Sequence, residues 1–488
     1  MNKLPPSRTT CQDLGVVRGS VFLTAVLALT ACGEAVAKPK PAAHGPSAKE
    51  TSNQAIADKP VDIVSMQRTG LVGALERPSS LKRFFETLAK LEAGTLEDDV
   101  RALHFGDSHT AADVETGAIR RALQARFGDG GRGYVPIGRP WKRYYMEGVR
   151  VGMSNEFEPQ KAKLDKGTQR LVGDGMYGLS GVGVITHQAG ARAWTDITAK
   201  TSRAEIDYLE QPSGGSFDVF VDGVRVVRIS TKGERTTSAF RAFDVLETAP
   251  HQLEVRAVGD GEVRVFGAIL DRAQKGVVYD TLGIGGYQIG HILHWNEQHW
   301  AEQLRHRAPA LVVLAYGTNE SAQTDMSQTT YERLLVNALG RIARAVPTAS
   351  CLLLGPPDRA IPSPDSKDKE NKVWVTAPKL LEIIQTQKRV AEAAGCAFYD
   401  QFTAMGGEGS MAAWAAEAPP RGQKDRVHLT KEGYVQLGTA FASDLMRAYA
   451  TWRKESGLPP SVSPVQRDSE PVSAPVAPQP ARVDTSDP

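Results

Sequence analysis

The sequence predicts an α/β domain built on a parallel sheet and interrupted by an inserted all-β jelly roll or sandwich. Short apolar strands alternate with amphipathic helices over residues 80–127 and again over residues 276–455. This alternation is typical of a parallel sheet covered by helices on both faces. Residues 149–271 instead show period-two alternation and turn residues, which indicates short antiparallel strands. The β block therefore lies within the α/β domain.

The α/β elements can be placed from the spacing of their apolar residues. Before the insertion we expect, in order, a helix at 80–91, a strand at 100–105 and a helix at 110–127, which Gly128 can end. After the insertion we expect strands at 276–282, 310–316, 351–355 and 396–400, with helices at 331–345 and 377–394.

The inserted block carries a clear hairpin signal. Val221-Asp-Gly-Val224 joins two alternating segments, and Asp-Gly fits the two-residue turns that connect antiparallel strands. Residues 208–223 resemble the jelly roll of carbohydrate-binding modules. The resemblance names no sugar-contacting residue.

The N-terminus has the features of a bacterial export signal. Arg8 and Arg18 precede an apolar run at 21–30 that is followed by small residues, as in a secretory signal peptide. Leu29-Thr-Ala-Cys32 resembles the lipobox of bacterial lipoproteins, in which the cysteine becomes the lipidated first residue. Glu34 indicates, by the same resemblance, the periplasmic face of the outer membrane of a Gram-negative bacterium. The alternative is a plain signal peptide in which Cys32 is incidental.

Composition divides the rest of the chain. Residues 33–60 and 457–488 are rich in Ala, Pro and Ser and lack apolar periodicity, so they are expected to be unfolded. We therefore predict a signal peptide at 1–31, a flexible tether at 32–60, the two parts of the α/β domain at 61–148 and 275–455, the β insertion at 149–274, and a disordered tail at 456–488.

Charge and cysteine content limit the classes of partner. The chain has 58 Lys and Arg against 56 Asp and Glu, so no strong field attracts nucleic acid or an anionic membrane. We expect a monomer that meets the membrane only through its lipid anchor. Cys351 and Cys396 each open a predicted strand. If these strands are neighbours the thiols can form a disulfide; otherwise they are buried free thiols.

Two motifs could supply a nucleophile and its base. Gly106-Asp-Ser108 follows a predicted strand and opens a helix, which places the serine at the ligand-binding edge of an open α/β sheet. Alternatively, Ser108 or Thr110 is only a helix N-cap. A serine hydroxyl needs a base, and the base needs a carboxylate to orient it. Asp425 and His428, three residues apart before a helix, can supply both.

Two further motifs follow predicted strands and could supply hydrogen-bond donors. Gly317-Thr-Asn319-Glu320 places an amide at the same sheet edge, and Gly285-Gly286 allows backbone N–H groups to approach a ligand closely.

These four blocks, in this order, resemble the SGNH (GDSL) hydrolase superfamily over about residues 80–450. The resemblance implies a flavodoxin-like three-layer α/β/α fold and a serine hydrolase without metal or other cofactor. It gives no means of choosing between Gly285 and Gly286. The roles that it implies are a nucleophile at Ser108, a base at His428, an orienting carboxylate at Asp425, and oxyanion donors at Ser108, Gly286 and Asn319.

Departures from the commonest pattern resemble one branch, the peptidoglycan O-acetylesterases. They are Gly-Asp-Ser-His in the first block, Gly-Thr-Asn-Glu in the third, Gly131-Arg-Gly-Tyr-Val, and the jelly-roll insertion. The implied reaction removes acetyl groups from the muramic acid 6-hydroxyl of cell-wall glycan, so acetylated peptidoglycan or a related polysaccharide is the expected partner. Alternatives are an O-acetyltransferase, another carbohydrate or lipid acyl esterase, and a non-catalytic cell-wall-binding lipoprotein.

Three further features are weaker. His291-x-x-His294 has a spacing that metal ligands can use, but no Cys or carboxylate stands at a matching offset, and we expect no metal. His109 either contacts substrate or packs. Arg359 follows a predicted strand at the same sheet edge and is a candidate to reach substrate.

Overall fold

The computed structural model describes residues 74–164, 171–366 and 372–459. The predicted signal peptide, Cys32, the predicted tether and most of the predicted tail lie outside these residues. Within the described ranges, no helix combines the length and the apolar character needed to cross a membrane.

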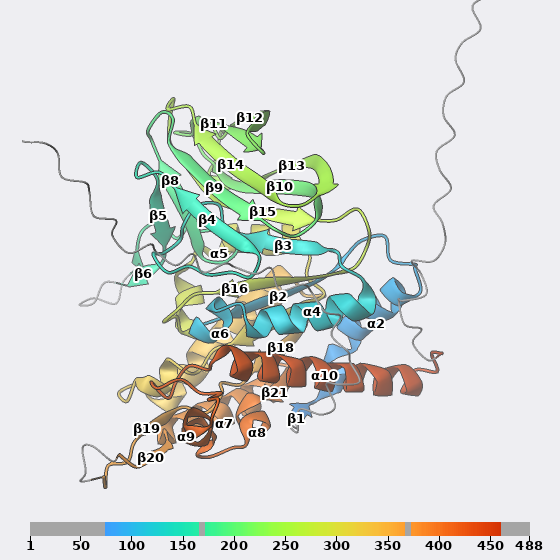
Figure 1. The fold of residues 1–488 in the computed structure, drawn as a ribbon, viewed down its shortest axis with the longest axis vertical. Helices are drawn as coiled ribbons and strands as arrows, with labels where there is room; N and C mark the ends of the chain where they lie inside the picture. Colours follow the sequence, from blue (N-terminus) through green and yellow to red (C-terminus); the bar gives the residue numbers. More distant parts are fainter. Residues whose placement is uncertain (1–73, 165–170, 367–371, 460–488) are drawn as a thin grey trace, which may run out of the picture. The chain divides into compact units, whose positions relative to one another are not determined.

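A six-stranded sheet carries the α/β part, in the order β1-β21-β18-β17-β2-β16 (Figure 1). All neighbouring strands from β16 to β21 pair in parallel, and β1 pairs with β21 antiparallel. The parallel strands have the 2-1-3-4-5 order of flavodoxin-like folds, so the predicted fold class is confirmed. The strands are β1 (Ala74–Glu76), β2 (Val100–Gly106), β16 (Val277–Gly283), β17 (Leu311–Ala315), β18 (Ser350–Leu354) and β21 (Ala397–Asp400).

Helices cover both faces of this sheet, because successive residues of each buried strand point to opposite sides. Leu103 and Phe105 of β2 pack in one apolar cluster, together with α5, α6 and α7. Val100 and Ala102 of the same strand pack in another, together with α2, α4 and α10. These helices are α2 (Lys82–Glu92), α4 (Glu115–Phe127), α5 (Glu297–Arg307), α6 (Gln328–Ala345), α7 (Pro378–Ala393) and α10 (Lys431–Glu455).

Short elements connect these layers. They are η1 (Pro78–Leu81), α3 (Ser108–Ala111), η2 (Ile289–His294), η3 (Glu320–Ala322), β19 (Ala360–Pro362), β20 (Trp374–Thr376), α8 (Gln401–Met405) and α9 (Ser410–Ala416).

The inserted block forms two antiparallel sheets that enclose their own apolar core (Figure 1). Phe217 and Val255 from one sheet meet Ile206 and Val265 from the other in this core. The first sheet contains β3 (Gly131–Val135), β5 (Glu158–Lys161), β8 (Val182–Thr186), β10 (Thr201–Glu210), β13 (Thr237–Thr248) and β15 (Val263–Asp271). The second contains β4 (Val149–Met153), β9 (Arg192–Ile197), β11 (Ser216–Val221), β12 (Val224–Ser230) and β14 (His251–Ala257). β6 (Lys163–Leu164) and β7 (Leu171–Val172) form a separate short ribbon.

Two local features differ from the sequence-based expectation. The predicted continuous helix at 110–127 is wrong, because the chain breaks between α3 and α4 at Asp113, which has a left-handed φ of 47°. The antiparallel sheets also begin earlier than residue 149, since β3 pairs with β15. The predicted hairpin at Val221–Val224 is confirmed, with φ values of 50° at Asp222 and 82° at Gly223, as two-residue turns with positive φ require.

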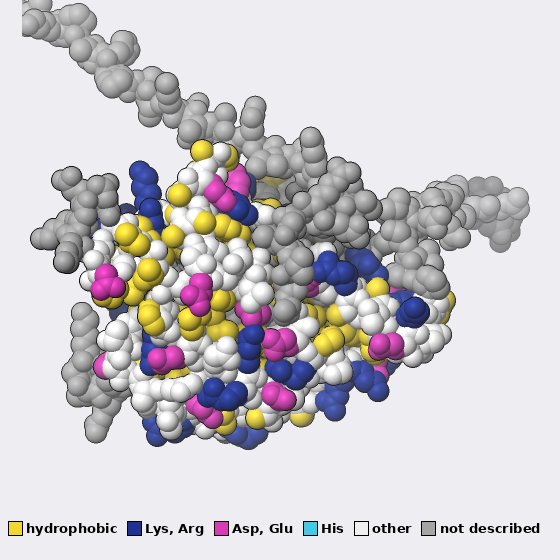
Figure 2. Space-filling model, turned by 90° about the horizontal axis from the view of Figure 1, so that it is seen from below, with side chains coloured by type: hydrophobic (Ala, Val, Ile, Leu, Met, Phe, Trp, Pro, Cys, Tyr) yellow, Lys and Arg dark blue, Asp and Glu magenta, His cyan; other side chains and the backbone are white. Residues whose placement is uncertain are grey.

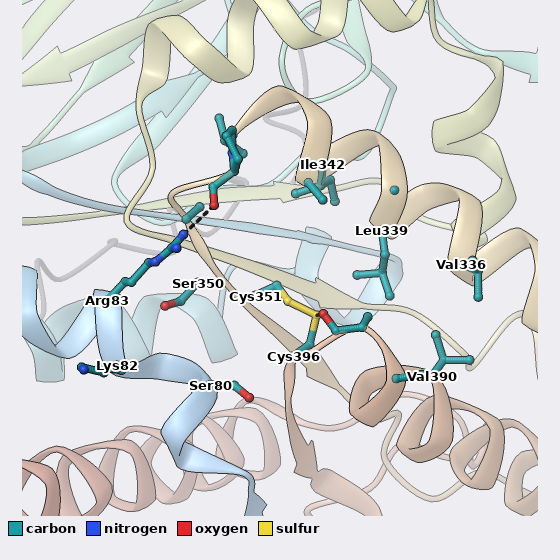
Figure 3. A pocket seen from close by; sticks show the side chains of 18 of the residues that line it. Ser80, Lys82, Arg83, Val336, Leu339, Ile342, Ser350, Cys351, Val390 and Cys396 are labelled. Atoms are coloured by element: carbon teal, nitrogen blue, oxygen red, sulfur yellow. Dashed lines mark hydrogen bonds between the residues drawn. A yellow bond between two sulfur atoms is a disulfide. The ribbon is translucent and has the colours of Figure 1, made fainter.

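Cys351 and Cys396 form a disulfide, with their Cα atoms 4.9 Å apart. Cys351 lies near the start of β18, and Cys396 immediately precedes its neighbour β21. The bridge therefore lies at the amino ends of these strands. Figure 3 shows it beside a pocket of about 710 Å³ whose apolar wall includes Leu339, Ile342 and Val390.

Charged side chains are interspersed on the surface seen in Figure 2, where Lys and Arg alternate with Asp and Glu rather than forming one basic region. The whole chain has nearly equal numbers of basic (58) and acidic (56) residues, and the two kinds are also mixed on this face.

Candidate active site

Three neighbouring strands bring the predicted site residues to one edge of the sheet. Ser108 follows β2, Asn319 follows β17, and Gly285 and Gly286 follow β16. The chain leaves β2 for β16 on one side, and continues later with β17 on the other side. Ligands of open α/β sheets bind outside the carboxyl ends of the strands at such a reversal of strand order.

The loop before α10 brings an imidazole to this edge. His428 Nε2 lies 2.9 Å from the Ser108 hydroxyl oxygen, although 320 residues separate them. His428 Nδ1 lies 2.7 Å from a carboxylate oxygen of Asp425. With Nδ1–H donating to this carboxylate, Nε2 is free to accept the serine hydrogen. The predicted Ser–His–Asp arrangement is therefore present as a continuous chain of hydrogen bonds.

The second oxygen of Asp425 holds the turn that presents the imidazole. It accepts the backbone N–H groups of Val427 and His428, each at 3.0 Å. Partial burial raises the pKa of Asp425, but the hydrogen bonds from the His428 ring and from these backbone groups outweigh it, so its pKa lies below the ordinary value. The carboxylate therefore stays ionised at neutral pH.

Several hydrogen-bond donors lie at the sheet edge that carries Ser108. Ser108 is the first residue of α3, where backbone N–H groups lack partners within the helix. The side-chain amide of Asn319 donates one hydrogen to the carbonyl oxygen of Tyr287 at 2.9 Å, which leaves its second hydrogen for a ligand. This bond ties the end of β17 to the loop after β16.

The two candidate glycines have different surroundings. A Cβ atom added to Gly285 would lie 3.9 Å from the Ser108 Cβ atom, so this residue borders the hydroxyl. Gly286 has a left-handed φ of 80°, and a Cβ atom there would meet nothing within 4 Å. Gly286 is thus required by the turn, whereas Gly285 lies against the serine. Both remain candidates for an oxyanion donor.

Glu320, which the sequence analysis noted only as the last residue of the Gly-Thr-Asn-Glu block, is a structural member of the site. Its carboxylate is fully buried and accepts the N–H groups of Ile289 at 2.7 Å and Gly317 at 3.0 Å. Burial raises its pKa to about 7, against the lowering effect of these bonds. Glu320 fixes the loop after β17 relative to the loop after β16. An acidic residue directly after Asn319 was the only available signal.

His109 packs behind the loop that carries His428. It is 5% exposed, its Nδ1 lies 3.0 Å from the Tyr434 hydroxyl, and its ring centroid is 5.5 Å from that of His428. Burial, followed by the charge of His428, lowers the pKa of His109 to about 3. His109 is therefore neutral. Of its two predicted roles, substrate contact and packing, the structure shows packing.

The remaining sequence candidates lie apart or at the rim. His291 is in η2, where its ring stacks on Tyr287 with centroids 4.3 Å apart. Arg359 lies beyond the end of β18 and donates to the carbonyl oxygen of Ser321 at 3.4 Å. In the part of the chain that the structure describes, no group of three or more His, Cys, Asp or Glu side chains is arranged to hold a metal ion.

A serine, an imidazole and a carboxylate are in contact at the carboxyl edge of a 2-1-3-4-5 sheet, which is the arrangement of an SGNH-type hydrolase. Residues 249–436 match the GDSL-like Lipase/Acylhydrolase family, and the protein carries an acylhydrolase domain of this family. The matched range includes Gly285, Asn319, Asp425 and His428. It excludes Ser108, which the β insertion separates from the other blocks.

Comparison with solved structures agrees with this fold. A peptidoglycan O-acetylesterase superposes with a TM-score of 0.61 at 22% identity, over 76% of this chain and 96% of that chain. Family two carbohydrate esterases from Clostridium thermocellum (TM-score 0.22, 11% identity, 56% of this chain and 95% of that chain) and from Cellvibrio japonicus (TM-score 0.24, 9% identity, 62% and 98%) also match. No curated protein sequence matches the chain.

Proposed function

We propose that this protein is a serine esterase that removes O-acetyl groups from cell-wall glycan, with Ser108 as nucleophile. The observation that carries the proposal is the hydrogen-bonded series Ser108–His428–Asp425, in which Nε2 lies 2.9 Å from the hydroxyl and Nδ1 lies 2.7 Å from the carboxylate. An unactivated serine is a weak nucleophile, and this series supplies the base and the orienting carboxylate that it needs.

The first half of the reaction forms an acetyl-enzyme. His428 Nε2 takes the hydroxyl proton as the Ser108 oxygen attacks the acetyl carbonyl carbon. The imidazolium then gives this proton to the leaving sugar oxygen, and the ester bond breaks. Asp425 stabilises the positive charge on the ring throughout, because its lowered pKa keeps it ionised.

The negative charge on the acetyl oxygen needs donors placed in advance. The Ser108 N–H, the free hydrogen of the Asn319 amide and an N–H from Gly285 or Gly286 are the candidates at this edge. The Asn319 amide is held by the Tyr287 carbonyl oxygen, and the Glu320 carboxylate is held by two backbone N–H groups. The donors therefore need little reorganisation when the charge develops.

The second half releases acetate. A water molecule gives a proton to His428 Nε2 and attacks the acetyl-enzyme, and the Ser108 oxygen leaves with the proton that the imidazolium returns. Ser108, Asn319 and His428 are only partly buried, and Gly285 and Gly286 are exposed, so a long glycan can reach the hydroxyl without entering a closed cavity.

The acetylated glycan substrate is supported by the fold neighbour, which is named a peptidoglycan O-acetylesterase. A direct test measures acetate released from O-acetylated peptidoglycan, from acetylated xylan and from a long-chain ester. We expect the highest kcat/KM on peptidoglycan. The Ser108→Ala variant should release no acetate from any of the three substrates. Preference for xylan or for the long-chain ester would reject peptidoglycan as the substrate. Acetate release by folded Ser108→Ala would reject Ser108 as the nucleophile.

Two other functions can be tested with the same preparation. An O-acetyltransferase would move the acetyl group to a glycan hydroxyl, so mass spectra would show newly acetylated oligosaccharide in place of free acetate. A non-catalytic cell-wall-binding protein would bind peptidoglycan and release no acetate. We expect free acetate to account for the acetyl groups lost.

We also propose that lipidated Cys32 anchors the enzyme to the periplasmic face of an outer membrane. The lipobox-like Leu29-Thr-Ala-Cys32 supports this. Metabolic labelling with a radioactive fatty acid should mark the wild-type protein and not Cys32→Ser. Equal labelling of both would reject the anchor.

A further inference from the structure

Arg359 lies between the two loops that supply the catalytic groups. Its guanidinium donates to the carbonyl oxygen of Ser321 at 3.4 Å, two residues beyond Asn319. The next residue, Ala360, donates its N–H to the carbonyl oxygen of Arg426 at 3.0 Å, within the turn that carries Asp425 and His428. Arg359 is thus connected to the proposed oxyanion side and to the imidazole side of the site.

The strand that leads to Arg359 ends close to the strand that leads to the nucleophile. Arg359 follows β18, which is two strands from β2 in the sheet. With neighbouring strands about 4.8 Å apart, the ends of β2 and β18 are separated by about 10 Å. An arginine side chain and one sugar ring can span this gap, so a substituent on the acetylated sugar can meet the guanidinium.

The charge of Arg359 has no counterpart in the described protein. No carboxylate of the described residues lies within ion-pair distance of it, and its recorded side-chain bond goes to a neutral carbonyl. The side chain is half-buried, and desolvation lowers the pKa of Arg359 with no acidic neighbour to offset it. A partly buried cation without an anionic partner is unfavourable.

Three of the most deeply buried arginines among the described residues are each paired with a carboxylate. Arg120 lies 3.1 Å from Asp113, Arg307 lies 2.7 Å from Asp280, and Arg453 contacts Glu92. The fold therefore neutralises arginines that serve its stability. Arg359, at the rim of the site, has no ion pair with any described residue; neighbouring Arg426 has none either, but its guanidinium lies over the Trp374 ring, 4.6 Å from the centroid.

We propose that Arg359 binds a carboxylate of the substrate and makes the enzyme prefer acetylated sugars that carry an acidic substituent. The inference rests on the proposed esterase function and deepens it. A guanidinium presents paired N–H donors that fit a carboxylate with two parallel hydrogen bonds. A muramic acid unit carries a lactyl carboxyl group, which is a free carboxylate wherever no stem peptide is attached to it through an amide bond, whereas acetylated neutral sugars lack this group. Arg359 binds the substrate and takes no part in bond cleavage.

The test compares two esters that differ only in this charge, 6-O-acetyl-N-acetylmuramic acid and its methyl ester. We expect the wild type to show a higher kcat/KM for the free acid. Arg359→Gln should lose about 10- to 100-fold on the acid, the usual contribution of a hydrogen bond to a charged group, through KM. Its kcat/KM on the methyl ester should stay within about twofold. Arg359→Lys should restore part of the preference.

Arg389→Gln is the matched control, because Arg389 is exposed and paired with Glu332 at 3.1 Å; it should keep the preference. Equal kcat/KM for the two esters in the wild type would overturn the inference and leave the esterase intact. An equal loss on both esters in Arg359→Gln would also overturn it, since Arg359 would then only support Asn319. If the wild type hydrolyses neither ester, the proposed function fails first and the inference with it.

Discussion

The His428 imidazole lies 2.9 Å from the Ser108 hydroxyl, across 320 residues of chain that include the whole β insertion. Both groups are supplied by loops at the carboxyl edge of the same parallel sheet. Ser108 opens α3, one residue beyond the end of β2, and His428 stands in the turn before α10, which packs on α4. The insertion does not separate them, since it begins after α4, which follows β2 along the chain, and ends where β16, the neighbour of β2, begins.

Asp425→Asn should lower kcat on 4-nitrophenyl acetate by on the order of 1,000- to 10,000-fold. An amide cannot stabilise the imidazolium, and it favours the wrong tautomer of His428. The backbone bonds that Asp425 accepts from Val427 and His428 can be kept by the amide oxygen, so the fold should persist by circular dichroism. Activity within tenfold of wild type would show that the carboxylate is not part of the mechanism.

Asn319→Ala should reduce kcat by on the order of 100- to 1,000-fold with little change in KM, because its amide donates to charge that exists only in the transition state. Steady-state kinetics on the same ester give both constants. A rise in KM at constant kcat would assign Asn319 to substrate binding instead. Exposed Glu432→Gln, on α10, should leave both constants unchanged.

The predictable part of this fold is the part encoded locally. Alternating apolar strands and helices predicted the parallel sheet, and Asp222-Gly223 predicted the hairpin. Strand order was implied only by the family resemblance, because periodicity does not say which strands are neighbours. The disulfide shows the same limit: two cysteines at strand starts allowed a bridge, and only the pairing of β18 with β21 brings them together.

Features that depend on distant partners could not be predicted. The break at Asp113 is one, since the apolar spacing continues through it while its buried carboxylate pairs with Arg120 and Arg132. The role of Glu320 is another, because it holds Ile289 and Gly317 through backbone N–H groups that have no sequence signature. The site motifs could be recognised in the sequence because their chemistry requires particular side chains.

Glu115→Gln should reduce the pH dependence of stability. Glu115 is 3% exposed and accepts a bond from Gln401, and burial raises its pKa from 4.5 to about 8. Between these values the folded state holds a proton that the unfolded chain releases, so the free energy of unfolding falls as pH rises.

Over the two units from pH 5 to pH 7 this single group contributes a loss of about 3 kcal/mol. Urea denaturation at both pH values should therefore show a smaller decline in Glu115→Gln than in the wild type, with Glu432→Gln as a control for net charge. An unchanged decline in Glu115→Gln would mean that Glu115 is ionised in the folded protein.

Replacing both Cys351 and Cys396 by Ser should destabilise the protein and spare its activity. The disulfide joins residues 45 apart, and closing a loop of this length is worth about 4 kcal/mol in the chain-entropy model. The bridge lies at the amino ends of its strands, away from the edge that carries Ser108. We expect a lower urea midpoint with unchanged kcat/KM at 25 °C. A large loss of kcat/KM in the folded variant would link the bridge to the site.

Covalent labelling of Ser108 tests the nucleophile most directly. The full-length protein is treated with a serine-reactive fluorophosphonate, digested and mapped by mass spectrometry. Activation by His428 at 2.9 Å predicts one phosphonyl group on the peptide that contains Ser108, with loss of esterase activity in proportion, and no label in Ser108→Ala or His428→Ala. An active enzyme that stays unlabelled at Ser108, or that carries its label on another serine, would contradict this assignment.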